Sequence, residues 1–140
     1  MTMMKPRLII LMTSILSLLA ACSFDSGAGS ITQQQLLKRL SEGEKTLILD
    51  VRTGGEYAQG YIPGAMHIDH REIESRIHEI KTYKDKTVVV YCLTGMRASM
   101  VEANLIEAGF SKVFHLQGDW SGWQAAGLPF TEPKEKSAQL

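Results

Sequence analysis

The sequence has few cysteines and no long apolar segment, and each shortage excludes a class of protein. Two cysteines, Cys22 and Cys92, stand among 140 residues, which excludes a small scaffold held together by several disulfides. The N-terminal apolar run from Leu8 to Ala20 is shorter than the roughly 20 residues with which a helix crosses a bilayer. No second run of this kind follows it, so a multi-span membrane protein is excluded too.

An excess of basic charge is also missing. The 15 lysines and arginines balance 15 aspartates and glutamates, and no polybasic arm or cluster stands out, so we expect no nucleic-acid partner. The roughly 120 residues after the N-terminal segment have a length typical of one domain with a single core.

The N-terminus has the composition of an export signal. Lys5 and Arg7 precede the run from Leu8 to Ala20, and Leu19-Ala20-Ala21-Cys22 ends it, an order typical of a cleaved signal peptide. These last four residues resemble the lipobox of bacterial lipoproteins, and the resemblance implies cleavage before Cys22 and its lipidation. Ser23, rather than an aspartate, follows, which resembles the pattern sorted to the outer membrane in Gram-negative bacteria. An ordinary secretory signal with an incidental cysteine is the alternative.

We therefore divide the chain into a signal peptide (1–21), a small polar tether (22–30), one domain (31–130) and a charged, frayed tail (131–140). Within the domain, apolar strand-like segments alternate with helical patterns. Strands are expected at 46–51, 65–68, 88–91 and 112–116, and helices at 32–40, 54–60 (a short helix or turn), 71–81, 98–108 and 120–126. Thr32 is the expected cap of the first helix and Gly109 the expected stop after 98–108. This alternation predicts an α/β domain with a parallel sheet covered on both faces.

Cys92 is the most informative residue of the domain. It directly follows the apolar segment from Thr87 to Tyr91 and precedes a helical pattern, a position where open α/β sheets bind ligands. Backbone N–H groups of a loop that enters a helix converge on one point, which favours an anion there and the thiolate form of a cysteine. Arg97 lies in the first helical turn, where a cation opposes the macrodipole, so we expect an anion beside it. The alternative is a buried structural cysteine followed by an exposed arginine.

Several motifs together resemble those of single-domain rhodaneses, in the order expected for that family and over about residues 30–130. The matching segments are Asp50 to Tyr57, Gly60 to Ala65, Tyr91 to Arg97, Leu116 to Gly118 and Trp123 to Pro129. The resemblance departs at two positions. Tyr61 stands where the family usually has histidine, and Asp119 takes the place of the second glycine of a late pair, which affects local packing or the pocket rim more than the chemistry.

The resemblance implies a three-layer α/β/α fold with a mostly parallel five-stranded sheet. It implies that Cys92 carries a sulfane sulfur as a persulfide, that Arg97 orients the donor anion, and that no metal or organic cofactor is needed. The donor is a small molecule such as thiosulfate, a persulfide or a polysulfide, and the acceptor is cyanide, a thiol or a partner protein's cysteine. The residues expected to bind the sulfur and its donor are Leu93, Thr94, Gly95, Met96 and Arg97.

The length of the loop separates this chemistry from that of related proteins. Phosphatases and arsenate reductases with a similar fold carry five residues between cysteine and arginine, because a tetrahedral oxyanion needs a wider ring of amides. Four residues separate Cys92 from Arg97, which favours sulfur transfer. Apart from Thr94 the loop is apolar, with no second cation for thiosulfate, and this favours a persulfide or polysulfide donor.

Two other functions stay open: an exported thiol-redox relay, in which Cys92 forms mixed disulfides, and a non-catalytic binding module. Asp50 and Arg52 are expected to form a structural ion pair, and Trp120 and Trp123 to pack the last helix. The four histidines show no spacing of metal ligands and are assigned to the surface or the core. They are His67, His70, His78 and His115.

Lipidation of Cys22 makes a prediction about location. Wild-type protein is expected in the membrane fraction on the exported side of the cell. The Cys22→Ala variant is expected to be released from membranes or held as uncleaved precursor, because the acyl chains supply the anchoring free energy. Cell fractionation with N-terminal sequencing makes the measurement. Soluble wild-type protein that begins at Met1 would contradict the prediction.

Overall fold

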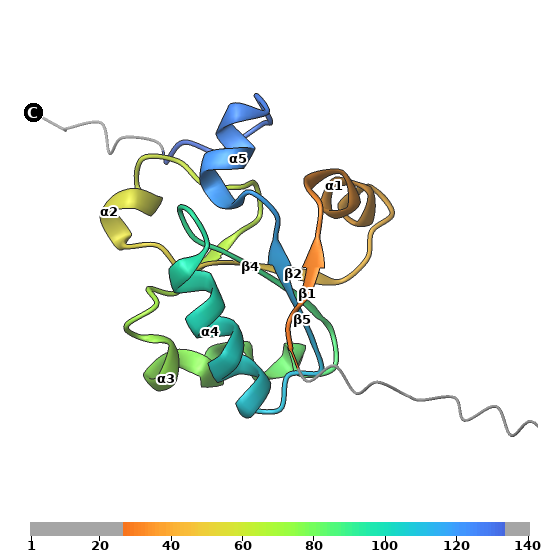
Figure 1. Cartoon of the computed structure of the whole chain (residues 1–140), viewed down its shortest axis with the longest axis vertical. Helices are drawn as coiled ribbons and strands as arrows, with labels where there is room; N and C mark the ends of the chain where they lie inside the picture. Colours follow the sequence, from red (N-terminus) through yellow and green to blue (C-terminus); the bar gives the residue numbers. More distant parts are fainter. Residues whose placement is uncertain (1–26, 134–140) are drawn as a thin grey trace, which may run out of the picture.

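The computed structural model describes residues 27–133, which form an α/β domain around one five-stranded sheet (Figure 1). All of its strand pairs are parallel, and the strand order is β1-β5-β4-β2-β3. The strands are β1 Gly29–Ile31, β2 Thr46–Asp50, β3 Met66–His67, β4 Thr87–Tyr91 and β5 Lys112–Leu116. The helices are α1 Gln33–Ser41, α2 Gly54–Tyr57, α3 Ile73–Arg76, α4 Met96–Glu107 and α5 Asp119–Ala125, with a 3-10 helix, η1, over Ile77–Tyr83. The expected fold class is confirmed.

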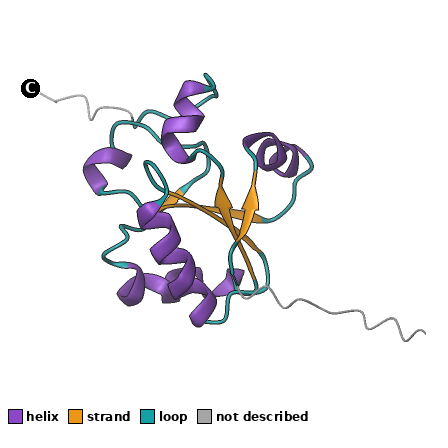
Figure 2. Ribbon diagram, in the orientation of Figure 1, coloured by secondary structure: helices purple, strands orange, loops and turns teal. Residues whose placement is uncertain are grey.

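Helices cover both faces of the sheet (Figure 2). Residues of α3, η1 and α4 pack with one apolar cluster, and residues of α1 and α5 pack with the other. Strand β4 shows why its sequence is continuously apolar: Val88 and Val90 belong to the first cluster, whereas Val89 and Tyr91 belong to the second. Alternate side chains of a strand point to opposite faces, so a strand between two helical layers needs apolar residues at every position.

The expected boundaries of two helices are close to the observed ones. Thr32 caps α1 through a reciprocal capping box with Gln35, in which each side chain bonds the other's backbone N–H. Helix α4 ends at Glu107, and Gly109 follows with a φ of 89°. That left-handed conformation is readily available only to glycine, which explains the stop.

The two ends of the domain differ from the expectation. Strand β1 was not predicted, and it pairs with β5, so the segment assigned to the tether contributes Gly29 and Ser30 to the sheet. At the other end, Thr131 exchanges two backbone hydrogen bonds with Tyr61, so the first residue assigned to the frayed tail is held in place. The segment predicted to be a signal peptide (1–21) and Cys22 lie outside the described residues. No helix within residues 27–133 is long and apolar enough to cross a membrane.

The expected amphipathic helix at 71–81 is in fact two shorter pieces, α3 and η1. Ile77 and Ile80 both face the core cluster, and their spacing of three residues matches the three residues per turn of a 3-10 helix. The apolar pattern was read correctly, but it fits both helix types over so short a segment.

A buried ion pair at the end of β2 joins several elements. Arg52 donates to both carboxylate oxygens of Asp50, with Nη2 to Oδ2 at 2.6 Å, and also to the carbonyl of Gly60 at 2.7 Å. Tyr91 of β4 donates its hydroxyl to Asp50 at 2.6 Å, and the Arg52 guanidinium lies 4.5 Å from the ring centroid of Trp120. Because Asp50 and Arg52 are at most 2% exposed, the expected structural ion pair is confirmed.

This geometry predicts a large cost for losing one partner of the pair. Arg52→Met is expected to lower the free energy of unfolding by about 3–5 kcal/mol, because it leaves the Asp50 carboxylate buried without a counter-charge. Urea denaturation measures the change. The matched control is Arg39→Met, which breaks the exposed pair with Glu44 and is expected to cost about 1 kcal/mol or less. Equal losses in the two variants would contradict the structural role of Arg52.

Candidate active site

Cys92 lies at the carboxyl end of β4, where the chain turns into α4. Its Sγ accepts the backbone N–H of Gly95 at 3.0 Å. Gly95 is the residue that caps α4, and its φ of 113° lies in the region that favours glycine. The loop therefore bends back so that one of its amides faces the thiol, as the sequence predicted. Roles for the amides of the other loop residues, Leu93, Thr94, Met96 and Arg97, stay predictions.

A second segment, the start of α5, binds the backbone of the same loop. The start of α5 contributes three hydrogen bonds: Asp119 accepts the Cys92 N–H at 2.9 Å, Trp120 donates to the Cys92 carbonyl at 3.0 Å, and Ser121 donates to the Leu93 carbonyl at 3.1 Å. Trp120 and Trp123 are buried and pack α5 onto the sheet, which confirms their expected role. The backbone of Cys92 is thus fixed on both sides of its Cα.

A chain of two buried carboxylates joined by a partly exposed histidine continues from this contact. His115 of β5 bonds Asp119 through Nε2 at 2.9 Å and Glu102 of α4 through Nδ1 at 2.5 Å. Glu102 and Asp119 are 6% and 3% exposed. Burial alone lowers the pKa of His115, but its hydrogen bond to Asp119 and the charge of Glu102 outweigh burial, so the pKa is raised. Burial raises the pKa of Glu102, against the opposing effect of His115.

Sequence reasoning missed this chain. His115 was assigned to the surface or the core, and Glu102 was not singled out. Two signals were present: Asp119 departs from the glycine expected there, and Glu102 follows Val101 on a helix face that the structure buries. A carboxylate on a buried helix position requires a partner, but only the packing of α4 against β5 brings His115 next to it.

Arg97 has a partner within the protein, and its expected role in orienting the donor anion stays a prediction. Its guanidinium donates Nη1 and Nη2 to the two carboxylate oxygens of Glu56 in α2, at 2.7 and 2.8 Å. Glu56 also accepts the N–H and hydroxyl of Thr53. The Arg97 hydrogen bond is the largest cause that lowers the pKa of Glu56 to about 2. The same bond raises the pKa of Arg97, with a smaller contribution from Cys92. The anion expected beside Arg97 is therefore Glu56.

Apolar side chains line the outer side of the loop. Leu93, Met96 and Met100 are 39%, 80% and 60% exposed, and Met96 and Met100 lie one turn apart on α4. The loop and the first turns of α4 thus expose aliphatic and thioether groups, while Arg97 and Glu56 form an ion pair within the protein.

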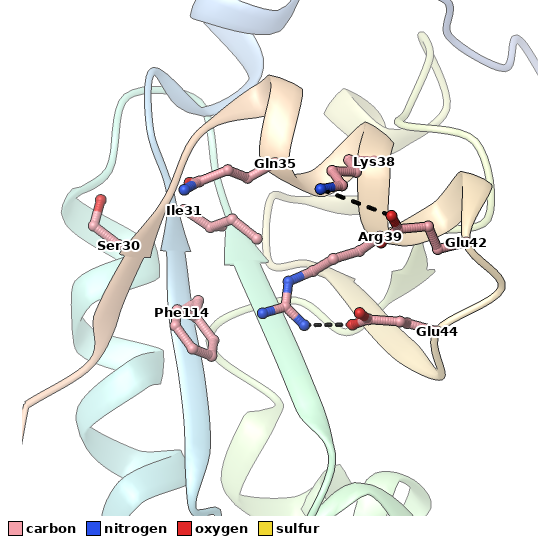
Figure 3. Close-up of a pocket in the computed structure, with 8 residues that line it drawn as sticks. All are labelled: Ser30, Ile31, Gln35, Lys38, Arg39, Glu42, Glu44 and Phe114. Carbon is pink, nitrogen blue, oxygen red and sulfur yellow. Dashed lines mark hydrogen bonds and ion pairs between the residues drawn. The ribbon is translucent and has the colours of Figure 1, made fainter.

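A separate pocket of about 260 Å³ lies between α1, β1 and β5 (Figure 3). Its charged residues are engaged with one another, Arg39 with Glu44 and Lys38 with Glu42. None of the predicted site residues lines it, so it is not the site of the thiol chemistry. The part of the chain that the structure describes holds no group of three or more side chains placed to bind a metal ion.

Comparison with known proteins agrees with the fold. Residues 32–126 match the rhodanese-like domain family. A sulfurtransferase of Allochromatium vinosum is 38% identical over 104 residues, which cover 74% of this chain and 95% of that relative. The crystal structure of the Alr3790 protein from Anabaena superposes with a TM-score of 0.66 at 30% identity, over 74% of this chain and 82% of that one. A thiosulfate sulfurtransferase from Pseudomonas aeruginosa superposes with a TM-score of 0.68 at 26% identity, over 73% of this chain but 19% of that one.

The chain therefore belongs to the rhodanese-like domain family. The matched residues include the Cys92 loop, α5 and the buried Asp50–Arg52 pair. Membership of this family and the relatives named as sulfurtransferases support the assignment of this chain to the sulfurtransferases.

The pair of Glu56 and Arg97 generates a prediction about acid stability. A carboxyl whose folded pKa is about 2, against 4.5 when unfolded, stabilises the fold above pH 4.5 and loses that contribution as the pH falls towards 2. Glu56→Gln is expected to be less stable than wild type by about 1 kcal/mol near neutral pH, because the pair is partly exposed. The difference is expected to vanish as the pH falls through that window.

Urea denaturation at a series of pH values makes the comparison. Glu42→Gln is the control, since Glu42 meets Lys38 at 3.8 Å on an exposed surface and is expected to contribute little at any pH. A Glu56→Gln deficit that persists unchanged at the acid end of the series would contradict an ionic contribution.

Proposed function

We propose that the protein moves a sulfane sulfur from a small donor to a thiophilic acceptor through a persulfide on Cys92. The observation that carries the proposal is the contact between Sγ and the Gly95 N–H at the start of α4. A preorganised amide at a helix N-terminus stabilises negative charge on sulfur without reorganisation during the reaction. The family supplies the reaction class, and this chain retains the thiol.

In the first half-reaction the Cys92 thiolate attacks the outer sulfur of the donor. With a persulfide R–S–SH, the bond from Sγ to the outer sulfur forms while the S–S bond of the donor breaks, and the thiolate R–S⁻ leaves with the electron pair of that bond. With thiosulfate, the leaving group is sulfite. Donor and acceptor therefore react with the protein one after the other and never need to meet, as in other covalent mechanisms.

In the second half-reaction an acceptor takes the terminal sulfur. Cyanide attacks it and leaves as thiocyanate, or a thiolate attacks it and becomes a new persulfide. Either way the electron pair of the Sγ–S bond returns to Cys92 as thiolate. No net oxidation occurs and no cofactor is required.

The surroundings of the loop favour persulfide or polysulfide donors over thiosulfate. Thiosulfate is a dianion, and Arg97, the cation on the loop, is already neutralised by Glu56. The exposed side chains of Leu93, Met96 and Met100 offer apolar contact instead. A donor with an organic group, whose charges are spread over a larger molecule, matches this surface better than a small dianion does.

The location proposed for this activity is the exported side of a membrane, which is the outer membrane if the host is Gram-negative. A lipidated Cys22 would hold the domain there. Donors and acceptors would then be small sulfur compounds, and possible partners would be exported proteins with reactive thiols.

The proposal predicts a change in intact mass. Reduced protein treated with glutathione persulfide is expected to gain one sulfur atom, and cyanide is expected to remove it and release thiocyanate. Thiosulfate is expected to load the protein at least about tenfold more slowly, because the one cation on the loop is neutralised by Glu56 and offers a dianion little net attraction. Mass spectrometry follows both reactions.

Cys92→Ser is the control and is expected to gain no sulfur. The two rival functions give different results in the same experiment. In a redox relay Cys92 would attack the inner sulfur of glutathione persulfide, which forms a mixed disulfide with glutathione and releases sulfide. A binding module would keep its unmodified mass. Either result with folded, reduced wild-type protein would overturn the proposal.

A further inference from the structure

The chain of Glu102, His115 and Asp119 ends on the residue that carries the thiol. Asp119 Oδ1 accepts the Cys92 N–H at 2.9 Å, while Asp119 Oδ2 bonds His115, which in turn bonds Glu102. Three elements of the fold, β5, α4 and α5, supply the chain. It therefore connects the interior of the protein to the backbone of the catalytic loop.

The chain also supports the loop residue that faces the thiol. A side chain placed on Gly95 would come within 3.1 Å of Asp119 Oδ2 and 3.3 Å of His115 Nε2. Gly95 thus packs directly on these two side chains, and its N–H points to Sγ. Asp119 therefore holds the backbone of Cys92, and together with His115 it lies against the residue that donates to Sγ.

The backbone of Asp119 is held in an unfavourable conformation. Among the described non-glycine residues, it is the one with a positive φ, 51°. This left-handed region costs free energy for residues with a Cβ, although aspartate tolerates it better than most. A glycine would adopt it freely, so the carboxylate supplies something that glycine lacks: the hydrogen bonds to Cys92 and His115.

The hydrogen bonds of the chain require a proton. Among residues 27–133, the charged groups within hydrogen-bond distance of His115 are Glu102 and Asp119. Ionised carboxylates only accept, and a neutral imidazole donates from one nitrogen, whereas protonated His115 donates from both. With His115 protonated and both acids ionised, every bond of the chain is satisfied. The side chain of His115 is 23% exposed, so its proton can exchange with solvent.

We propose that Glu102, His115 and Asp119 act as positioning residues for Cys92, and that the proton on His115 holds Asp119 against the Cys92 amide. Loss of this proton to solvent leaves a neutral imidazole, which donates to only one of the two carboxylates. Glu102 and Asp119 then share one donor, and their negative charges, close to the site where the persulfide anion forms, are no longer balanced by the imidazolium. This inference rests on the proposed function for its readout of sulfur transfer, but the geometry of the loop is independent of it.

The test compares wild type with His115→Gln from about pH 5 to about pH 9, a range that spans the ordinary histidine pKa of about 6.5. Two rates are measured at each pH: sulfur loading from glutathione persulfide and alkylation of Cys92 by neutral iodoacetamide. Dividing the wild-type rate by the variant rate cancels the effect of ionising the Cys92 thiol, which both proteins share. We expect wild type to load sulfur about tenfold faster at the acid end, since small misplacements of a reacting group have effects of this size or larger. The ratio is expected to approach one as the pH rises.

A second variant keeps the test decisive if His115→Gln does not fold. Glu102→Gln retains a partner for His115 but removes the negative charge that helps to raise its pKa. The midpoint is the pH at which sulfur loading loses half of the contribution of the His115 proton. It is expected to be lower in this variant than in wild type. The control is His78→Gln, which changes an exposed histidine on η1 whose ring bonds the Ser75 carbonyl, and it is expected to follow the wild-type curve at every pH.

The outcomes separate the two proposals. Ratios for His115→Gln that stay flat with pH in both assays, or a Glu102→Gln midpoint equal to that of wild type, would overturn the positioning role even if sulfur loads normally. A wild type that takes up no sulfur but shows the pH-dependent ratio in alkylation would overturn the proposed function and support the positioning role.

Discussion

The site depends on a charge buried at the end of β2. Arg52, at 2% exposure, is compensated by Asp50, which also accepts the hydroxyl of Tyr91 from the strand that leads to the thiol. The same guanidinium lies over Trp120, whose amide donates to the Cys92 carbonyl. Burying an ion pair is costly unless every group is satisfied, and satisfying this one fixes the relative places of β2, β4 and α5. The loop between β4 and α4 is built on that arrangement.

The two helices that meet at Cys92 have different tasks. Helix α4 provides the amide that faces the sulfur, and its first turn carries Arg97, which is bound to Glu56 of α2. The start of α5 holds the backbone of Cys92 through Asp119 and its neighbours. The thiol is therefore stabilised from one side and positioned from the other. Neither task requires a side chain that exchanges a proton with the substrate, which suits a reaction between soft sulfur nucleophiles.

Local patterns made much of the fold predictable. The capping box at Thr32, the apolar run of β4 and the glycine after α4 each have a physical cause within a few residues. Strand β1 was missed because three residues carry too short a pattern to indicate a strand. The segment is extended because it pairs with β5. In the site, the position of Cys92 was readable from the order of strand, loop and helix. The partner of Arg97 was not, because Glu56 lies 41 positions earlier in the sequence.

The central claim is that Cys92 itself holds the sulfur between donor and acceptor. The most direct measurement is a single turnover without free donor: protein loaded with glutathione persulfide is passed through a desalting column and then mixed with cyanide. The account predicts one thiocyanate released for each loaded chain, together with recovery of a free Cys92 thiol that can be loaded again. Loaded protein that releases no thiocyanate unless donor is present would contradict a covalent carrier and require donor and acceptor to meet directly on the protein.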